Sequence, residues 1–377
     1  MVTKGLGTLH WPVCNSEAGC PNKHHWSWPS LPGVEMHHVH LERPTVSLAS
    51  LYEHSEITVL ERRSATVIFT IAVRYSLAEI TMPRWQQYSA LHGYDFLWVR
   101  SRNKNVTGEV TAAWDRVFVA QQLFSKGYRE VMHVDGDTAV LAWETPVTEY
   151  IRSSAGPFAN ASSDSFLYVS QDRARFGAYQ PSKKDFNHGI SLHSGGQVSG
   201  PNNFAVWIMR RSVAALTALE QLVTMSTRQD WRFQRFPAEQ GVINAWLGQN
   251  CSCKVDSANA SRMLCPPWGR MFLAPTRPCT YAQASYGTFQ RFLGRGDEPI
   301  HTKKPRQEWA TALKATLKRY RDAGVFVLHT PSMGEHRDFL FMTFRMVQEL
   351  FPIELPPDAS RRSRTSYVWL HRRKARK

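Results

Sequence analysis

The stretch Val131–Thr138 reads Val-Met-His-Val-Asp-Gly-Asp-Thr, an apolar run that ends in two carboxylates separated by one residue. Val131, Met132 and Val134 suit a strand buried on both faces, for which a nearly continuous apolar run is typical. Ligands of open α/β sheets bind beyond the carboxyl ends of such strands. Paired acids at that edge suit a hard divalent cation, which takes oxygen ligands and often bridges a protein to a phosphate. The same acids also suit a simple capped turn, so the local pattern leaves both interpretations open.

The preceding segments alternate between strand and helix patterns. Ala65–Val73 and Tyr94–Val99 have the length and the β-branched or aromatic composition of strands. Ser76–Leu91 reads as a helix, and a second helix opens near Trp114 and stops at Gly127. The order β-α-β-α-β predicts a parallel sheet with helices packed on it. No G-x-G-x-x-G and no G-x-x-x-x-G-K follows the first strand, which argues against a dinucleotide-binding fold and a P-loop.

The second half of the chain contains another strand that is followed directly by a potential metal ligand. The elements expected before it are a loop-rich segment over 151–202, a strand over Phe204–Met209, a helix capped by Ser212 with Leu216, Leu219 and Val223 on one face, a helix from near Pro237 with Val242, Ile243, Trp246 and Leu247 inward, and a basic helix over Trp309–Arg321. The strand Val325–Leu328 then ends at His329. We expect an irregular stem over 1–60, a single α/β domain over 61–350 with a cysteine-bearing loop at 251–279, and a basic tail over 351–377.

The composition is that of a globular protein with a strongly basic end. The 377 residues are 42% hydrophobic, enough to bury a core in one large domain or two ordinary ones. The net charge is +15, and residues 361–377 carry eight of the positive charges and no acid. Such a tail suits a nucleic acid or an anionic membrane surface, although a solvated tail is more frequent. The remaining excess suits an acidic substrate such as a nucleotide diphosphate.

The cysteines and the glycosylation sequons both indicate an oxidising compartment. Four of the six cysteines lie in residues 251–279, where Cys251-Ser252-Cys253 is too tight for a usual zinc knuckle, so disulfides are expected. Four sequons start at Asn105, Asn160, Asn250 and Asn259. No segment approaches the roughly 18–20 apolar residues of a membrane span, and the start lacks a signal-peptide core. We expect the Golgi or another secretory-pathway lumen, and a type II membrane protein if an anchor is missing from this chain.

Taken in order, these features resemble a GT-A glycosyltransferase, and most of all glycosyltransferase family 34, the galactosyl, xylosyl and mannosyl transferases of the Golgi. The resemblance covers about Thr66 to Leu340. It rests on six short motifs: His92-Gly93-Tyr94-Asp95, Trp114-Asp115-Arg116, Asp135-Gly136-Asp137, Asn203 with the strand that follows it, Glu239-Gln240, and Val327-Leu328-His329. It implies a Rossmann-like nucleotide-diphospho-sugar transferase fold, with a mostly parallel central sheet and helices on both faces.

The resemblance also implies a metal site and a catalytic amide. Asp135 and Asp137 would hold Mn²⁺ against the donor diphosphate, with His329 as the third ligand, and the cation would neutralise charge on the leaving group. Gln240 matches the position of an amide near the anomeric carbon, and Glu239 stands where the family more often has Asp. These enzymes retain the anomeric configuration, by front-face attack that needs no strong nucleophile.

Further positions match residues that bind the donor in the family. These donor-binding positions are Thr70, Arg74, Arg116, Asp135, Gly136 and Asn203, the last of which would contact the donor or acceptor sugar. Arg116 replaces a Lys that the family usually has. Thr330-Pro331-Ser332 departs from the family pattern, in which an aromatic residue precedes a small residue, Gly and Cys. This departure concerns the acceptor side and the closing loop.

We therefore expect an Mn²⁺-dependent retaining glycosyltransferase that moves a hexose or pentose from a nucleotide-diphosphate sugar, with UDP as the expected nucleotide, to a glycan or glycoprotein. A catalytically silent glycan-binding relative is one alternative. A nucleic-acid-binding protein is another, but it requires basic and aromatic residues interleaved on one face, and no nucleic-acid partner is expected because the charge lies outside the apparent domain. A glycosidase needs acids about 5–10 Å apart across a sugar, which suits the adjacent aspartates poorly.

Overall fold

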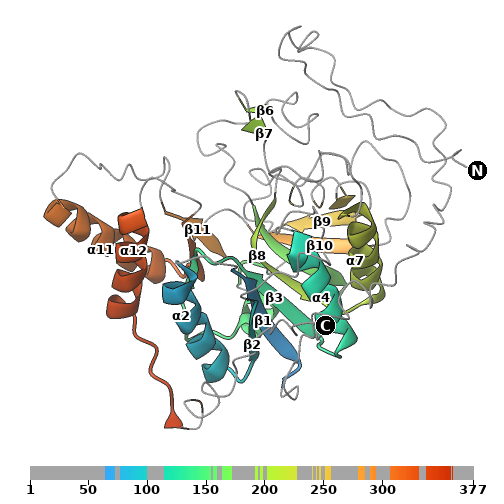
Figure 1. Ribbon diagram of the computed structural model, residues 1–377, viewed down its shortest axis with the longest axis horizontal. Coiled ribbons are helices and arrows are strands. Elements are labelled where there is room, and N and C mark those ends of the chain that lie inside the picture. Colours follow the sequence, from blue (N-terminus) through green and yellow to red (C-terminus); the bar gives the residue numbers. More distant parts are fainter. Residues whose placement is uncertain are drawn as a thin grey trace, which may run out of the picture.

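A seven-stranded sheet forms the centre of the molecule (Figure 1). The computed structural model describes residues 64–72, 77–99, 114–153, 156–158, 164–171, 192–193, 196–197, 202–226, 240, 243, 246–247, 251–255, 279–284, 289–293, 306–330, 337–357 and 359. The strands lie in the order β2 (Asp95–Val99), β1 (Thr66–Ile71), β3 (Glu130–Val134), β8 (Asn202–Arg210), β5 (Ser165–Gln171), β10 (Cys279–Ala284) and β9 (Cys251–Val255).

All neighbouring strands of this sheet are parallel except at β8, which is antiparallel to both β3 and β5. The expected mixed α/β architecture with a mostly parallel sheet is therefore confirmed. Because β8 runs the other way, it begins at the edge where β3 and β5 end. Asn203 pairs with Ser170 near the end of β5, and Val206 pairs with Val134 at the end of β3. The reversed strand thus adds side chains to the carboxyl edge of the sheet.

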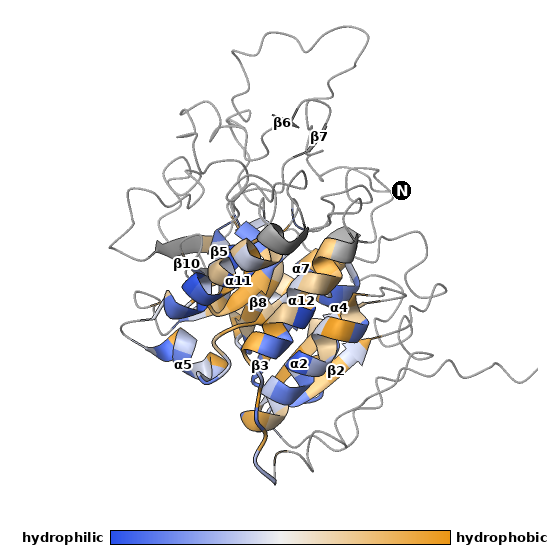
Figure 2. Ribbon diagram, turned by 90° about the vertical axis from the view of Figure 1, so that its left-hand side faces the viewer, coloured by the Kyte–Doolittle hydropathy of each residue, from blue (hydrophilic) through white to orange (hydrophobic). Residues whose placement is uncertain are grey.

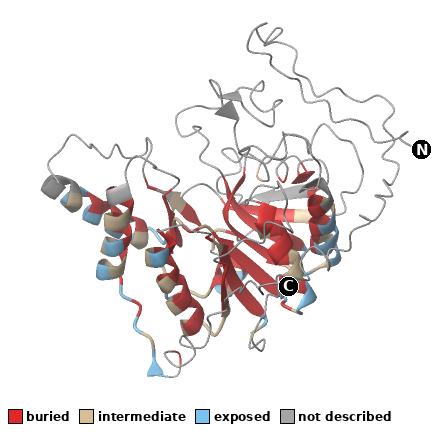
Figure 3. Ribbon diagram, in the orientation of Figure 1, coloured by how far each residue is buried: buried red, intermediate tan, exposed pale blue. Residues whose placement is uncertain are grey.

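Helices cover both faces of the sheet and enclose two hydrophobic cores. One core packs α4 (Asp115–Ser125) and α7 (Val213–Ser226) against the sheet, and the other packs α2 (Ala78–Leu91) against the opposite face. Side chains alternate between the faces of a strand, so neighbours such as Ile68 and Phe69 belong to different cores. The strands are buried and the outward faces of the helices are exposed (Figure 3). β8 is mostly apolar, as expected for a strand covered on both sides (Figure 2).

A small second sheet lies beside the first and joins distant parts of the chain. It consists of β11 (Gln290–Phe292), β12 (Val327–His329) and β4 (Thr138–Val140), with β12 in the middle. Two helices, α11 (Arg306–Asp322) and α12 (Arg337–Leu350), pack here around a third core that includes Leu317, Leu328 and Phe344. They lie next to α2 in Figure 1. This sheet places the end of β12 against the start of β4.

Several elements were not expected from the sequence. Residues 151–202 were predicted to be loop-rich, but they contain β5 and the end of a short helix, α5 (Val147–Arg152). Residues 251–279 were predicted to be a loop, but β9 lies there and β10 begins at Cys279. The short strand β11 and the helix α12 are also additional. β5 is buried along its whole length because its side chains pack into the cores on both faces of the sheet, so its sequence lacks the alternation of polar and apolar residues that marks a half-exposed strand.

The expected helix after β8 is confirmed, with one error in its inner face. Ser212 Oγ accepts a hydrogen bond from Ala215 N at 3.1 Å, which is the predicted cap. Leu219 and Val223 are buried, but Leu216 is 38% exposed, because the buried stripe runs through Ala215 and its neighbours instead. Further along, the structure places Gln240, Ile243, Trp246 and Leu247 in helical conformation, and the last three are buried as predicted.

Other predictions fall outside the described residues. These are the stem, the four sequon asparagines, Arg74, Pro237, Glu239, Val242 and the basic residues of the tail beyond 359. The expected disulfides of the cysteine-bearing segment 251–279 also stay a prediction. Among the residues that the structure describes, no helix is long and apolar enough to cross a membrane.

Candidate metal centre

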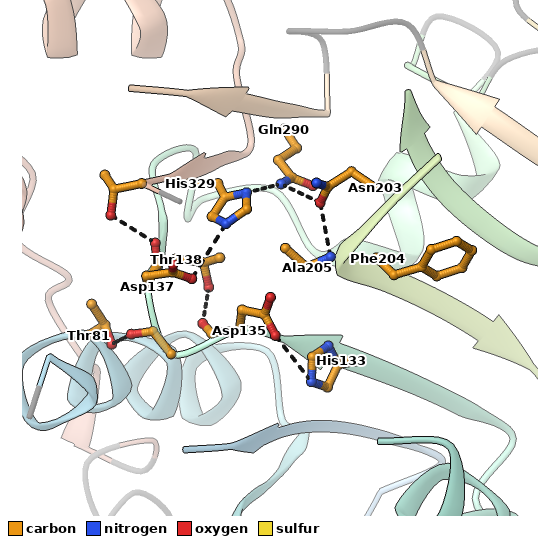
Figure 4. A network of polar contacts seen from close by, with 12 residues as sticks. Thr81, His133, Asp135, Asp137, Thr138, Asn203, Phe204, Ala205, Gln290 and His329 are labelled. Atoms are coloured by element: carbon orange, nitrogen blue, oxygen red, sulfur yellow. Dashed lines mark hydrogen bonds and ion pairs between the residues drawn. The ribbon is translucent and has the colours of Figure 1, made fainter. Parts of the chain in front are cut away.

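The Asp135-Gly136-Asp137 turn joins β3 to β4, and its three backbone carbonyls are held by hydroxyl groups (Figure 4). Thr138 Oγ1 donates to the first carbonyl at 2.7 Å, and Thr81 Oγ1 of α2 donates to the second at 2.7 Å. Thr330 donates to the third through its backbone N–H at 3.0 Å and its hydroxyl at 3.2 Å. Because these bonds come from three elements, the backbone of the turn is fixed from several sides. Its two carboxylates project from a rigid support.

His329 reaches this turn because β12 pairs antiparallel with β4. The register sets His329 opposite Thr138, one residue after Asp137. His329 Nε2 lies 3.5 Å from Asp137 Oδ1, and the potential ligand atoms of Asp135, Asp137 and His329 all lie within 4.8 Å of one another. The structure thus brings together the three residues that the sequence predicted as metal ligands, although His329 is far along the chain. His329 is buried, while the side chain of Asp135 is 28% exposed, so the group opens towards solvent on the Asp135 side.

The chemistry of this group fits a divalent cation such as Mn²⁺. Two carboxylates supply hard oxygen ligands, and one imidazole suits a first-row transition metal. Three protein ligands leave coordination positions for phosphate oxygens or water. The donor atoms are already clustered in the described structure, so a cation would need little rearrangement of the backbone. The alternative of a plain capped turn does not explain why a buried imidazole from a second sheet meets the two acids.

Two basic side chains lie behind Asp135, and they differ in charge. Arg116 Nη2 lies 3.3 Å from Asp135 Oδ1, and its Nη1 donates to the carbonyl of Phe204 at 2.8 Å. His133 Nε2 lies 3.7 Å from the same Asp135 oxygen and its ring stacks on Trp207. Burial, followed by the charge of Arg116, lowers the pKa of His133 well below its ordinary value. His133 is therefore neutral at physiological pH, and Arg116 supplies the positive charge beside Asp135.

A chain of amide groups connects the imidazole to β8. Gln290 Nε2 lies 2.7 Å from His329 Nδ1 and donates to Asn203 Oδ1 at 3.1 Å. Asn203 Oδ1 also accepts from Ala205 N at 2.9 Å. All of these side chains are buried, and they come from β11, β12 and β8 (Figure 4). The predicted sugar contact, Asn203, is thereby linked to the predicted metal ligand.

The other predicted site residues lie at the same edge of the sheet where the structure describes them. Gln240 Oε1 accepts a hydrogen bond from Phe204 N at 3.1 Å, so the backbone of Phe204 is held by both Gln240 and Arg116. Thr70 is fully buried near the end of β1, and within the described part of the chain its hydroxyl has no hydrogen-bond partner. Gly136 is buried in the turn. Glu239 and Arg74 lie outside the described residues.

Four residues have structural roles at this site that were not predicted from the sequence. Thr81 and Thr330 fix the turn, while His133 and Gln290 contact proposed ligands. Of these, His133 carried a usable signal, because a histidine inside an otherwise apolar buried strand requires a specific environment. The others are ordinary residue types whose partners are far away in the chain.

Comparison with known proteins gives distant structural matches. No protein-family model and no curated protein matches the chain. A glycosyltransferase involved in the glycosylation of the major capsid of PBCV-1 aligns at 15% identity and a TM-score of 0.43, over 74% of this chain and 98% of that one. The galactosyltransferase LgtC, in complex with donor and acceptor sugar analogs, aligns at 12% identity and 0.36, over 79% and 99% of the two chains. GlyE of Streptococcus pneumoniae TIGR4 aligns at 10% identity and 0.36, over 79% and 65%. These TM-scores are too low to support an argument, so the assignment of function depends on the site itself.

Proposed function

We propose that this protein is a metal-dependent GT-A glycosyltransferase that moves a hexose or pentose from a nucleotide-diphosphate sugar, with UDP as the expected nucleotide, to a glycan or glycoprotein. The observation that carries this proposal is the convergence of Asp135, Asp137 and His329 at the carboxyl edge of an α/β sheet. This edge is where ligands bind in open sheets. A carboxylate pair with an imidazole suits a cation that in turn holds a diphosphate.

The residues of the site have distinct proposed roles. Asp135, Asp137 and His329 would hold Mn²⁺, which when bound supplies charge neutralisation for the leaving diphosphate. Arg116 keeps Asp135 in place and adds positive charge on the same side of the site. Asn203 has an amide suited to sugar hydroxyls, at the edge of β8.

Retention of configuration is part of the proposal and depends on Gln240. Its amide lies beside the start of β8, next to the Phe204 peptide that Arg116 also contacts. An amide is a weak nucleophile, so its role is to orient the sugar for attack on the face that the leaving group vacates. The bond that Gln240 Oε1 accepts from Phe204 also favours a second candidate, a relative that binds sugar without turnover, because that oxygen is already occupied.

The cellular setting and the partners are proposals that the sequence supports. Four sequons and an even number of cysteines favour the Golgi or another secretory-pathway lumen. A type II membrane arrangement would follow if an anchor precedes this chain. The acceptor would then be a glycan or a glycoprotein.

The experiment is a panel of nucleotide-sugars incubated with and without Mn²⁺, with hydrolysis and transfer measured by release of nucleoside diphosphate. The parent should turn over one of the nucleotide-sugars, and it should do so only when Mn²⁺ is present. Asp137→Asn should lower the rate of that turnover by roughly 100-fold or more because it removes a metal ligand. Asp164→Asn is the control, since it removes the same charge from an exposed position. Equal activity of Asp137→Asn and the parent would exclude the metal assignment. Binding of a nucleotide-sugar without turnover of any donor would favour the silent relative.

A further inference from the structure

We propose that the positive charge of Arg116 makes the binding of a divalent cation depend on a nucleoside diphosphate. The guanidinium lowers the affinity of the site for the cation alone, and it raises the affinity for the diphosphate when the cation is present. The inference rests on the proposed function and concerns how that same site is regulated. The cation and the nucleotide would bind as a pair, and Arg116 would be the residue that couples them.

Arg116 lies beside a proposed metal ligand without being one. Its Nη2 lies 3.3 Å from Asp135 Oδ1, and the potential ligand atoms of Asp135, Asp137 and His329 all lie within 4.8 Å of one another. The side chains of Arg116 and Asp135 are 13% and 28% exposed, so solvent and salt screen this pair only in part. A cation held by Asp135 would therefore meet a nearby positive charge that is weakly screened.

A second contact holds the guanidinium in this place. Arg116 Nη1 donates to the carbonyl of Phe204 at 2.8 Å, and the N–H of Phe204 donates to Gln240 Oε1 at 3.1 Å. The contact between Arg116 and Phe204 does not involve Asp135, so it would persist when the carboxylate binds a cation. A guanidinium also stays protonated in proteins. The positive charge is thus a permanent part of the site.

The charges of the ligands and of Arg116 determine what the site can hold. The carboxylates of Asp135 and Asp137 together with the guanidinium of Arg116 leave a single net negative charge. A divalent cation alone would reverse this charge in a partly buried place, and a diphosphate alone would increase it. The charges of a divalent cation and a diphosphate nearly cancel when both bind. Each ligand should therefore raise the affinity of the site for the other by the same factor.

Two effects of removing Arg116 on cation binding oppose each other. The loss of a hydrogen-bonded support behind a metal ligand typically weakens metal binding by about 10–100-fold. The repulsion between a unit charge and a divalent cation at a separation of roughly 6 Å corresponds to about 10-fold in affinity in bulk water, and to about 10,000-fold at the effective dielectric constant of about 20 that suits charges near a protein surface. Because the pair is partly buried, the electrostatic effect is the larger one. A neutral residue at position 116 should strengthen binding of the cation alone.

Three substitutions separate the charge of Arg116 from its hydrogen bonds. Arg116→Met removes both, whereas Arg116→Lys keeps the charge and gives up the planar fork that reaches Asp135 and Phe204 together. Arg210→Met is the matched control. Arg210 Nε also lies beside a carboxylate, 3.8 Å from Glu130 Oε1, but Glu130 is at the start of β3, whereas Asp135 follows its end. The control removes the same charge from the protein at the opposite edge of the sheet.

The first measurement is Mn²⁺ binding without nucleotide, followed by electron paramagnetic resonance of the free ion. Arg116→Met should bind Mn²⁺ at least about 10-fold more tightly than the parent. Neither Arg116→Lys nor Arg210→Met should bind it more tightly than the parent. The second measurement is binding of UDP, and of GDP and ADP in turn, by isothermal titration calorimetry in excess Mn²⁺. Arg116→Met should bind the nucleotide that the parent prefers at least about 10-fold more weakly.

The direction of the first result makes the test decisive. Damage to the fold weakens a binding site, so a misfolded Arg116→Met could not bind Mn²⁺ more tightly. If this variant binds Mn²⁺ as the parent does or more weakly, Arg116 only supports Asp135 and the inference is wrong.

The other outcomes are assigned as follows. Equally tight binding by Arg116→Lys or Arg210→Met, or an unchanged nucleotide affinity in Arg116→Met, would also overturn the inference. If the parent binds neither Mn²⁺ nor any of the three nucleotides, the proposed metal centre fails, which is a different result from a failure of the role of Arg116.

Discussion

Replacing Thr81 with Val removes one hydroxyl from beneath the Asp135-Gly136-Asp137 turn and leaves the shape of the side chain almost unchanged. Thr81 is 1% exposed and its Oγ1 lies 2.7 Å from the carbonyl oxygen of Gly136 and 3.3 Å from that of Leu77. A hydroxyl has a single proton, and the shorter distance assigns it to Gly136. The substitution therefore leaves a buried carbonyl without this donor.

The expected loss of stability follows from that unpaired group. Leaving a buried acceptor unsatisfied costs about 1–3 kcal/mol, whereas the change in volume is small. Thr343→Val provides a matched control on another helix, α12. Thr343 is 0% exposed, and its hydroxyl has no hydrogen-bond partner within the described ranges. Removing that hydroxyl should leave the stability unchanged or raise it by up to about 1 kcal/mol.

The assay is urea-induced unfolding followed by tryptophan fluorescence, in EDTA so that no cation stabilises the turn. The midpoint should fall for Thr81→Val at an unchanged m value, and it should not fall for Thr343→Val. Mn²⁺ binding by Thr81→Val should also weaken, because a looser turn must be ordered when the cation binds. If Thr81→Val is as stable as the parent, or if both variants lose the same amount, the hydroxyl does not support the turn.

Three further results are expected. The pKa of His133 lies well below its ordinary value, so below about pH 6.5 the unfolded chain binds a proton that the folded chain does not bind. The free energy of unfolding should therefore fall as the pH drops below about 6.5. Urea unfolding should show a steeper fall for the parent than for His133→Phe, by up to about 1.4 kcal/mol per pH unit. Ser212→Ala should cost about 0.5–2 kcal/mol by loss of the α7 cap, while Ser212→Asp should retain the stability of the parent. Mn²⁺ at roughly 100 times its Kd should stabilise the parent by about 2.7 kcal/mol in thermal unfolding, and Asp137→Asn should show no such gain at that concentration.

The sequence predicted the elements whose patterns are local. The apolar runs of β1, β3 and β12, the cap at Ser212 and the stop at Gly127, which has a φ of 91°, are all signals within a few residues. β9 and β10 lacked such a signal because their short runs mix polar and apolar residues, and their strand character depends on pairing with each other and with β5. α12 also carries a local signal, an amphipathic pattern whose apolar residues are all buried: Phe339, Leu340, Phe344 and Val347.

The residues of the candidate site likewise fall into those that the local sequence predicts and those that it does not. The three proposed ligands were recognisable because acids and a histidine at strand ends are unusual residue types there. Thr81 and Gln290 were not, because their roles depend on partners 55 and 39 residues away. Nothing in the local sequence distinguishes a buried threonine that holds a turn from one, such as Thr343, that makes no bond with the described residues. Such assignments require the tertiary structure.

The pairing of β4 with β12 determines when the proposed metal site becomes complete during synthesis of the protein. A ribosome synthesises β1, β3 and the aspartate turn long before it reaches residue 329, and the central strands can fold in that interval. Until β12 arrives, the two aspartates are without their imidazole partner and should hold a cation weakly. Tight Mn²⁺ binding would then be acquired at a late stage of synthesis. A nascent chain arrested before β12 would lack it even if its β1–β3 unit were folded.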